Sequence, residues 1–399
     1  MRHITEHLVQ GILTLSGSIT GLVILLIVIF LFKEGFGLFR NPEIEKGYAL
    51  CLHISNPVER LHSKQIKLIF DSEITNWQDL GGNDCEIRIF RFDEIFSLYS
   101  DDELGEDYAL LPQKLGEVVE QDSAIIAFLP EKYLPVNNRY VKTLPTASIS
   151  PVDFLQGREW MPTSTPAPQF GTLPLILGTL WVSIFAILIA LPLGLGVAIY
   201  LSELAGERMR KLLKPTIELL AGIPSVVYGF FGLAALVPLL QKTFQLQVGE
   251  SALAGSLILS IMALPTIITI AEDAMRNTPQ AMREASLALG ATHWQTIYKV
   301  IIPYAASGIS AAIVLGIGRA IGETMAVLMV TGNAAIMPHS LFEPVRTIPA
   351  TIAAELGEAP AGGTHYQSLF LLGCILFLIT MIISVSTEII SRKQQSKGM

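Results

Sequence analysis

The strongest constraint in this sequence is the recurrence of predominantly apolar runs that are long enough to cross a lipid bilayer as helices. A spanning helix needs about 20 such residues. The first run covers residues 11–32 and contains no charged residue. The later runs follow a long polar segment and cover residues 173–200, 217–240, 253–270, 302–330 and 368–390. The sequence therefore predicts an α-helical polytopic membrane protein with six spans.

The composition agrees with this class and excludes others. Only 16% of the residues are charged, whereas soluble domains carry about 25%. This low charge excludes a wholly soluble or disordered chain. The sequence has no basic surface of the kind that nucleic acid requires. Its three cysteines are too few for a disulfide scaffold or, unaided, for a four-ligand zinc site.

The first run is predicted to remain as a membrane anchor. A cleaved signal peptide has a shorter apolar region of about 7–15 residues and ends at a small-residue site. Here the run is followed by Lys-Glu-Gly-Phe-Gly at 33–37, which is a poor cleavage site. Three later runs contain a proline: Pro192, Pro224 and Pro265. Because proline removes a helix hydrogen bond, the sequence predicts a bundle with bends.

The orientation follows from Lys and Arg in the short loops, which are enriched on the cytoplasmic side. With a cytoplasmic N-terminus, eleven of these residues lie inside and two, Lys242 and Arg346, lie outside. The eleven are Arg2, Arg208, Arg210, Lys211, Lys214, Arg276, Arg283, Lys299, Arg392, Lys393 and Lys397. Both termini are therefore predicted inside.

The segment 34–170 is predicted to be an extracytoplasmic insert. It has no apolar run long enough to span, and residues 33–170 hold 13 Lys and Arg against 22 Asp and Glu, a net charge of −9. Residues 86–91 alternate like a strand, and residues 63–70 read as a helix entered at a serine cap, so a small α/β core is expected. The predicted division is 1–33 for the N-terminus and first span, 34–170 for the insert and its linker, and 171–399 for five spans.

Two cysteines, Cys51 and Cys85, lie in the insert. A disulfide between them is one prediction, because the outer side of the membrane is oxidising. Two unpaired buried thiols are the other. Cys374, in the last span, is expected to be an ordinary packing residue.

No motif for catalysis is present. The chain has no Gly-x-x-x-x-Gly-Lys-Ser/Thr loop and therefore no phosphate cradle of that kind. His-Glu-x-x-His and Gly-x-Ser-x-Gly are also missing. We therefore expect no enzyme activity, metal site or bound cofactor in this chain.

A pair of short helices is predicted between the fourth and fifth spans, at residues 276–300. Thr278 and Pro279 form a helix start, with Thr as the cap and Pro at the first helical position. The helix continues from Gln280 and stops at Gly290, because glycine favours the left-handed position after a helix.

The second helix of this pair is predicted to begin at Thr292. Gln295, three residues on, completes a capping box, and Pro303 marks the entry into the next span. One interpretation is a loop that completes a turn. The other is a rigid surface pair that receives force from a soluble motor.

This segment carries a resemblance to a known family. Glu284-Ala285-Ser286-x-x-x-Gly290, followed by Val300-x-Ile302-Pro303, resembles the EAA loop of bacterial ABC importer permeases. In that family the loop is the helix that docks into a groove of the cytoplasmic ATPase. The resemblance thus implies that the coupling residues are Glu284, Ala285, Ser286, Gly290 and Pro303, and that ATP and Mg are used by a separate ATPase chain.

Two longer motifs narrow the resemblance. Residues 218–229, ELLAGIPSVVYG, and residues 318–327, GRAIGETMAV, resemble the PstC-type permease of phosphate-specific (Pst) importers. The resemblance covers about residues 150–392. It implies the fold of a type I ABC importer permease and phosphate as the transported anion.

Arg319 and Glu323 are the candidate translocation residues. They stand four apart, which predicts one helical face near the middle of the fifth span. A charged residue at the bilayer centre costs about 2.5–3.5 kcal/mol on insertion scales, so it faces the bundle interior or a water path. The pair is either a structural ion pair or an arginine that offers its planar donor fork to an oxyanion in transit, with Glu323 restraining its charge. Sulfate or molybdate would suit the same guanidinium.

The insert has a resemblance of its own. Leu61, Ile66, Ile69-Phe70 and the run 74–82, ITNWQDLGG, resemble part of a periplasmic phosphate-binding protein. In that family the arginine matching Arg91 is followed by a Ser-Gly-Thr cradle, whereas here Asp93 and Glu94 follow. Added carboxylates repel a dianion, so we expect that the insert does not bind phosphate and serves docking or stability.

The predicted function is a permease subunit of an ATP-driven phosphate importer. The implied partners are a second, PstA-type permease, a PstB-type ATPase dimer and a PstS-type binding protein, with no nucleic acid. One alternative is a permease for sulfate or molybdate. The other is a membrane receptor that senses phosphate through its outer domain.

Overall fold

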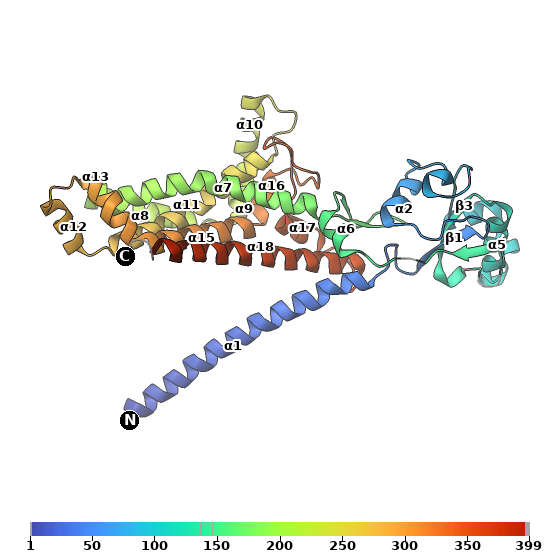
Figure 1. The fold of residues 1–399 in the computed structure, drawn as a ribbon, viewed down its shortest axis with the longest axis horizontal. Coiled ribbons are helices and arrows are strands. Elements are labelled where there is room, and N and C mark those ends of the chain that lie inside the picture. The colour runs from blue at the N-terminus through green and yellow to red at the C-terminus, as the bar shows by residue number, and fades with distance from the viewer. Residues whose placement is uncertain (1, 136–137, 146, 396–399) are drawn as a thin grey trace. The chain divides into compact units, whose positions relative to one another are not determined.

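The computed structural model describes residues 2–135, 138–145 and 147–395. Lys397, one of the residues used to predict the orientation, lies outside them. The chain divides into two compact units, which are Met1–Gly35 with Leu173–Met399, and Phe36–Thr172. We call them the helical unit and the insert (Figure 1).

The helical unit is built from long helices joined by short ones. The long helices are α1 (Arg2–Phe36), α7 (Leu173–Ile199), α11 (Ala252–Arg276), α15 (Ala306–Gly322) and α18 (Thr364–Gln395). The short α-helices are α8 (Glu207–Ala221), α9 (Ser225–Phe231), α10 (Val237–Phe244), α12 (Gln280–Ala288), α13 (His293–Thr296), α14 (Ile302–Tyr304), α16 (Met325–Val330) and α17 (Ile348–Glu355). Three π-helical turns join them: η6 (Tyr200–Leu204), η7 (Gly232–Leu236) and η8 (Ile297–Ile301).

Five of the described helical segments are long and apolar enough to cross a membrane, and six are if one bent pair is counted as a span. The predicted helical membrane fold is thereby confirmed. α11 is the centre of the unit, because 61% of its most apolar window is buried. The window of α1, by contrast, is 0% buried.

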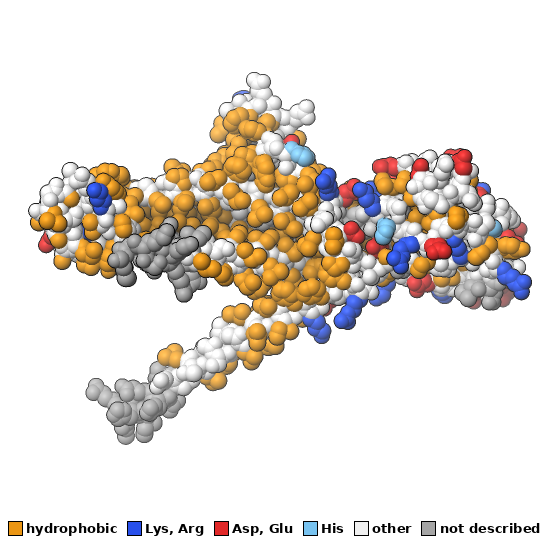
Figure 2. Space-filling model, in the orientation of Figure 1, with side chains coloured by type: hydrophobic (Ala, Val, Ile, Leu, Met, Phe, Trp, Pro, Cys, Tyr) orange, Lys and Arg blue, Asp and Glu red, His pale blue; other side chains and the backbone are white. Residues whose placement is uncertain are grey.

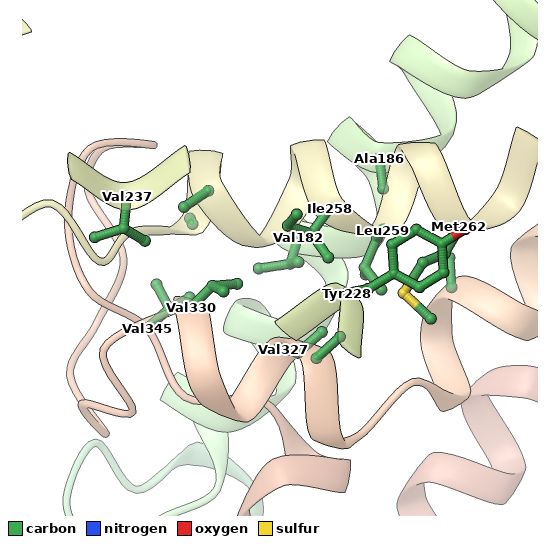
Figure 3. Packing of buried hydrophobic residues seen from close by; sticks show 14 of the residues in the cluster. Val182, Ala186, Tyr228, Val237, Ile258, Leu259, Met262, Val327, Val330 and Val345 are labelled. Atoms are coloured by element: carbon green, nitrogen blue, oxygen red, sulfur yellow. The ribbon is translucent and has the colours of Figure 1, made fainter. Parts of the chain in front are cut away.

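The core of the helical unit lies where α7, α9, α11 and α16 meet. Figure 3 shows Val182 of α7, Tyr228 of α9, Ile258 and Met262 of α11 and Val327 of α16 packed in one cluster. Glycine allows the closest approach, because a Cβ on Gly255 would lie 2.5 Å from the Thr331 side chain. On the visible face, hydrophobic side chains cover most of the helical unit, as expected for a membrane protein (Figure 2).

Two predicted spans differ from the structure. The run 217–240 is not one helix, because α8 ends before Gly222 and the apolar span is Ser225–Phe244. Pro224 explains the break, since the residue before a proline avoids the helical conformation. The run 302–330 is broken twice. A bend of 70° separates residues 293–304 from α15, and residues 323–324 separate α15 from α16.

The insert is a small α/β unit, as its alternating segments predict. Its main sheet has the order β2-β3-β1-β4, with β2 parallel to β3 and the other pairs antiparallel. The strands are β1 (Tyr48–His53), β2 (Arg88–Arg91), β3 (Ile125–Pro130) and β4 (Val141–Thr143), with a separate pair β5 (Trp160–Met161) and β6 (Gln169–Phe170). The α-helices are α2 (Ser63–Phe70), α3 (Ile95–Leu98), α4 (Asp101–Leu104), α5 (Leu111–Gln121) and α6 (Pro151–Gln156). The short 3₁₀ turns are η1 (Gly37–Arg40), η2 (Trp77–Leu80), η3 (Phe92–Glu94), η4 (Glu106–Tyr108) and η5 (Glu131–Tyr133).

Two details of the insert correct the sequence prediction. The helix at 63–70 is capped by His62 and not by Ser63, because Gln65 and His62 form the capping box. The predicted strand at 86–91 begins at Arg88.

The cysteines of the insert lie on opposite faces of the sheet. Successive side chains of a strand point to opposite faces. Leu50 and Leu52 of β1 belong to the cluster that Cys85 packs against, whereas Cys51 belongs to the other cluster. Both thiols are free, so the disulfide alternative is wrong and the unpaired alternative is confirmed for Cys51, which is fully buried.

Candidate functional site

The segment between α11 and the fifth span forms two short helices, as predicted. α12 covers Gln280–Ala288 and α13 covers His293–Thr296. Gly290 lies between them at a φ of +85°, where a side chain would be strained. No atom lies within 4 Å of the position a Cβ would take there. The glycine is therefore required by the backbone and not by packing.

The two caps of this pair differ from each other. Thr292 caps α13 as predicted, since its Oγ1 accepts from the Gln295 amide and the Gln295 side chain accepts from the Thr292 amide. The predicted Thr278 cap is wrong. α12 begins after Pro279, and the buried Thr278 hydroxyl has no hydrogen-bond partner in the described part of the chain. Pro279 takes the N-cap position in an extended conformation, and its ring carries no acceptor for the orphan amides.

Four of the predicted coupling residues lie on or beside α12. Glu284 and Ala285 are exposed, and the Glu284 carboxylate accepts from Gln280 at 2.9 Å. Ser286 is half-buried, and its Oγ lies 2.9 Å from Thr296 Oγ1 of α13. This hydroxyl pair ties α12 to α13, so the two helices form one piece with Gly290 at the turn.

The fifth predicted coupling residue, Pro303, stands apart from the others. It lies exposed in α14, immediately before the 70° bend. The structure therefore does not bring Pro303 into the surface formed by α12 and α13.

Arg283 anchors α12 to the rest of the helical unit. Its Nη1 donates to Glu203 Oε2 at 2.6 Å, and its Nη2 donates to the Met275 carbonyl at 2.8 Å. Glu203 belongs to η6, the turn that ends α7, and its side chain is 6% exposed. These bonds tie α12 to the end of α7 and to the end of α11.

A second anchor holds the amphipathic helix α8 to the end of α11. The Glu272 carboxylate, 1% exposed, accepts from Lys214 at 2.6 Å and from Arg210 at 2.8 Å. Burial lowers the pKa of Lys214, but hydrogen bonds to Glu272 and Asp273 outweigh burial, so the pKa is raised. The sequence prediction used Arg210 and Lys214 only as positive charges that indicate the orientation of the chain. Their spacing of four places both on one face of α8, but nothing in the sequence indicates that this face meets Glu272.

The turn between α12 and α13 presents apolar side chains to its surroundings. Leu289 is 89% exposed and Trp294 is 59% exposed. Large apolar side chains at this level of exposure are typical of a surface that a partner covers.

Arg319 lies on α15 and faces α11. Its Nη1 donates to Thr266 Oγ1 at 3.2 Å. Thr266 is close to the midpoint of the 25-residue α11, so the guanidinium lies beside the centre of a span. The close approach of α15 to α11 comes from Gly316, where a Cβ would lie 2.8 Å from Ile267. Gly318 and Gly322 have no such neighbour among the described residues.

Glu323 does not share a helical face with Arg319, and this prediction is wrong. α15 ends at Gly322, and Glu323 has the extended conformation, with φ of −71° and ψ of +132°. No ion pair joins the two residues within the described ranges. Glu323 therefore begins an irregular backbone segment and does not continue α15.

An irregular backbone at this depth has a physical consequence. Unpaired peptide groups are tolerated within a membrane only where protein buries them or where they line a water-filled cavity. A cavity of about 530 Å³ adjoins the break and is lined by Gly322, Thr324 and residues of α17 and α18. The broken helix thus adjoins a cavity, but neither Arg319 nor Glu323 is among the residues that line it.

A charged network that the sequence prediction missed lies in the segment between α16 and α18. Glu355 accepts from Arg346 at 2.6 Å and contacts His365 Nε2 at 2.9 Å. Arg346 also donates to the Asn333 carbonyl. These contacts fix α17 between its two neighbours. No group of three or more His, Cys, Asp or Glu that could hold a metal exists among the described residues.

Residues 190–396 match the family described as "Binding-protein-dependent transport system inner membrane component". This match covers more than half of the chain. The chain belongs to that family. It is a multi-pass inner membrane component and a transport subunit, and the predicted permease fold is confirmed.

Several curated proteins are similar to this member of the family. The probable ABC transporter permease protein YqgH of Bacillus subtilis (strain 168) is 42% identical over 247 residues, 62% of this chain and 80% of that protein. The phosphate transport system permease protein PstC of Mesorhizobium japonicum is 42% identical over 58% of this chain and 75% of that protein. PstC of Pasteurella multocida is 38% identical over 61% of this chain and 81% of that protein. The predicted resemblance to PstC-type permeases is confirmed.

Proposed function

We propose that this chain is the PstC-type permease subunit of an ATP-driven phosphate importer. Its relatives that carry the name of phosphate transport permeases are matched over three quarters or more of their length. The single observation that carries the proposal in the structure is Arg319, a guanidinium placed beside the centre of α11 and next to a broken helix. A planar donor fork in a water-accessible path suits a tetrahedral oxyanion.

The proposed pathway uses Arg319 and Glu323. Only one hydrogen bond, to Thr266, involves the Arg319 side chain among the described residues, so donors remain for an anion in transit. Glu323, at the break, would add a negative charge that limits how tightly the anion is held. Weak binding is needed for release, because a transported ion must leave its site as well as enter it.

The proposed coupling surface is formed by Glu284, Ala285, Ser286 and Gly290, with the exposed Leu289 between them. It would dock into a separate PstB-type ATPase dimer that uses ATP and Mg, while this chain binds no cofactor itself. Arg283 would carry the motion to α7. A PstA-type permease and a PstS-type binding protein would complete the importer, in which Pro303 lies at the bend that follows the docking surface.

The proposed topology places both termini in the cytoplasm. Residues 34–170 are then extracytoplasmic, and residues 1–33 and 171–399 form the membrane part with its coupling loop at 276–300. The anchors support this assignment, since α8 and α12, which carry five of the eleven Lys and Arg predicted inside, are tied to the ends of α7 and α11 that approach the coupling surface.

The experiment is phosphate uptake into vesicles that contain this chain, its permease partner and the ATPase, with the binding protein supplied. Arg319→Ala should abolish uptake, while Arg319→Lys should leave a small residual rate because a point charge replaces the fork. Lys242→Ala, at the exposed end of α10, is the matched control and should transport normally. Normal uptake by assembled Arg319→Ala would contradict the pathway.

Competition experiments in the same vesicles identify the transported anion. Excess sulfate or molybdate should leave the uptake of labelled phosphate unchanged if the importer is specific. Strong competition by either anion would contradict specificity for phosphate and make that anion the proposed substrate.

A further inference from the structure

One face of the insert carries a row of aromatic rings. Tyr133 and Phe92 are stacked with ring centroids 5.7 Å apart, and Phe92 meets Phe96 edge to face at 5.8 Å. Phe96 in turn meets Tyr108 at 5.7 Å. Because each ring touches the next, the four form one continuous patch although they come from four elements, η3, α3, η4 and η5.

This patch is only partly covered by the insert itself. Phe96 is 44% exposed, Tyr108 41%, and the neighbouring Leu98 and Leu110 are 54% and 44% exposed. Among the described residues of the insert, four of the ten exposed large hydrophobic side chains thus fall within residues 96–110. Scattered exposed apolar residues need no explanation, but a contiguous set indicates an interaction surface.

The same segment is strongly acidic. Residues 92–110 contain seven Asp and Glu and no Lys or Arg. Among the described residues, Asp101, Asp102, Glu106 and Asp107 have no ion-pair partner. The carboxylates are exposed, so the segment that carries Phe96 and Tyr108 bears uncompensated negative charge. One cation lies at the end of the ring row, where Lys132 Nζ is 5.0 Å from the centroid of the Tyr133 ring. Figure 2 shows acidic side chains on the visible surface of the insert.

The aromatic rings and the carboxylates together determine which kind of partner this face can bind. Rings bind Lys and Arg cations over their faces, and carboxylates bind them through charge-assisted hydrogen bonds. A second copy of the face would be repelled by its like charge, as would the anionic head groups of a membrane. A metal is not favoured either, because no cluster of three ligands is present in the described part of the insert. The partner that fits is a protein surface rich in Lys and Arg.

We propose that the acidic ring face, defined as Phe92, Phe96, Tyr108 and Tyr133 with the carboxylates at 101, 102, 106 and 107, docks a basic patch of the extracytoplasmic binding protein. This proposal rests on the proposed function, which requires such a protein on the side of the insert. The face gives the binding protein a long-range attraction, so its main effect is on the rate of association.

The experiment measures binding of the purified binding protein to the complete transporter in lipid nanodiscs. The test variant neutralises the face with Asp101→Asn, Asp102→Asn, Glu106→Gln and Asp107→Asn. Asn is a safe choice at position 107, where φ is +52°, because Asn tolerates the left-handed region. The matched control neutralises four exposed carboxylates elsewhere on the insert: Glu45→Gln, Glu59→Gln, Glu73→Gln and Asp79→Asn.

The neutralised face should weaken binding roughly tenfold at low ionic strength, mostly through a slower association rate. Its affinity should also lose most of its salt dependence, whereas the control should stay within about twofold of the wild type. Phe96→Ser, which removes an exposed ring of the row without changing any charge, should instead raise the dissociation rate.

Two results would overturn the proposal. One is equal affinity and equal salt dependence for the wild type and the neutralised face, and the other is an equal loss in the control variant. Phosphate uptake by the wild-type transporter is measured in parallel. Intact uptake with unchanged docking would reject the ring face alone, whereas a transporter that imports no phosphate would reject the proposed function.

Discussion

The guanidinium of Arg283 on α12 and the carboxylate of Glu203 at the end of α7 form a direct ion pair, with Nη1 and Oε2 2.6 Å apart. Glu203 is nearly buried, and its second oxygen, Oε1, has no hydrogen-bond partner among the described residues. Arg283 is therefore the group that compensates this charge. The pair joins the surface proposed to receive work from the ATPase to a membrane span.

Arg283→Gln should destabilise the helical unit and uncouple the transporter. Removing one partner leaves a buried charge uncompensated, which costs about 3–5 kcal/mol. The apparent melting temperature in detergent should fall, and the phosphate transported per ATP hydrolysed should fall with it.

The double variant Arg283→Gln with Glu203→Gln separates the two effects. It removes the charge as well as its partner, so the melting temperature should recover. Coupling should remain low, because no ion pair joins α12 to α7. A double variant that regains full coupling would show that the pair serves stability alone.

Gly290→Ala should strain the turn between α12 and α13. At a φ of +85° an alanine costs about 1–2 kcal/mol, and no neighbouring atom adds to this cost. Hydrogen exchange of the α12 and α13 amides should become faster, and stimulation of the ATPase should drop. Gly206→Ala is the control, since that glycine has equal space and a φ of −64°. Equal behaviour of the two variants would contradict the backbone explanation.

Thiol chemistry tests the arrangement of the insert. Burial raises the pKa of Cys51 to about 11, so at pH 8 only roughly one molecule in a thousand carries the reactive thiolate. Alkylation of native protein should therefore modify Cys85 first, and the Cys51 rate should rise with pH toward 11. Denaturation without reductant should expose all three thiols. Mass spectrometry that finds Cys51 linked to Cys85 would disprove the opposite-face arrangement.

The sequence was sufficient to predict those local structures that only a few adjacent residues determine. Gly290 and the Thr292 capping box are such cases, because a left-handed turn and a cap need only a few adjacent residues. The prediction that Thr278 caps α12 was wrong because Pro279 occupies the N-cap position. The first residue of the helix is therefore Gln280.

Features that depend on tertiary contacts were not predictable from spacing. Arg319 and Glu323 have ideal helical spacing, yet α15 ends between them, at Gly322. Gly316 and Gly318 stand in the same helix without breaking it, so a glycine at position 322 did not by itself identify the break. The Glu272 anchor likewise joins two helices more than fifty residues apart. Composition identified the charges, but only the fold determined their partners.

The contact between Arg319 and Thr266 gives the last prediction. If the threonine hydroxyl orients the guanidinium toward the break after Gly322, Thr266→Val should leave a free arginine that adopts several rotamers. Phosphate uptake should fall several-fold, since a hydrogen bond to a charged group contributes about 1.5–3 kcal/mol. Thr266→Ser keeps the hydroxyl and should transport like the wild type, which separates the hydrogen bond from the packing of the methyl group. The affinity of the transporter for its binding protein should be the same in both variants, because Thr266 lies near the middle of α11 and not on the insert. Uptake that is equally reduced in the serine and valine variants would assign Thr266 a packing role and leave the orientation of Arg319 to other residues of the bundle.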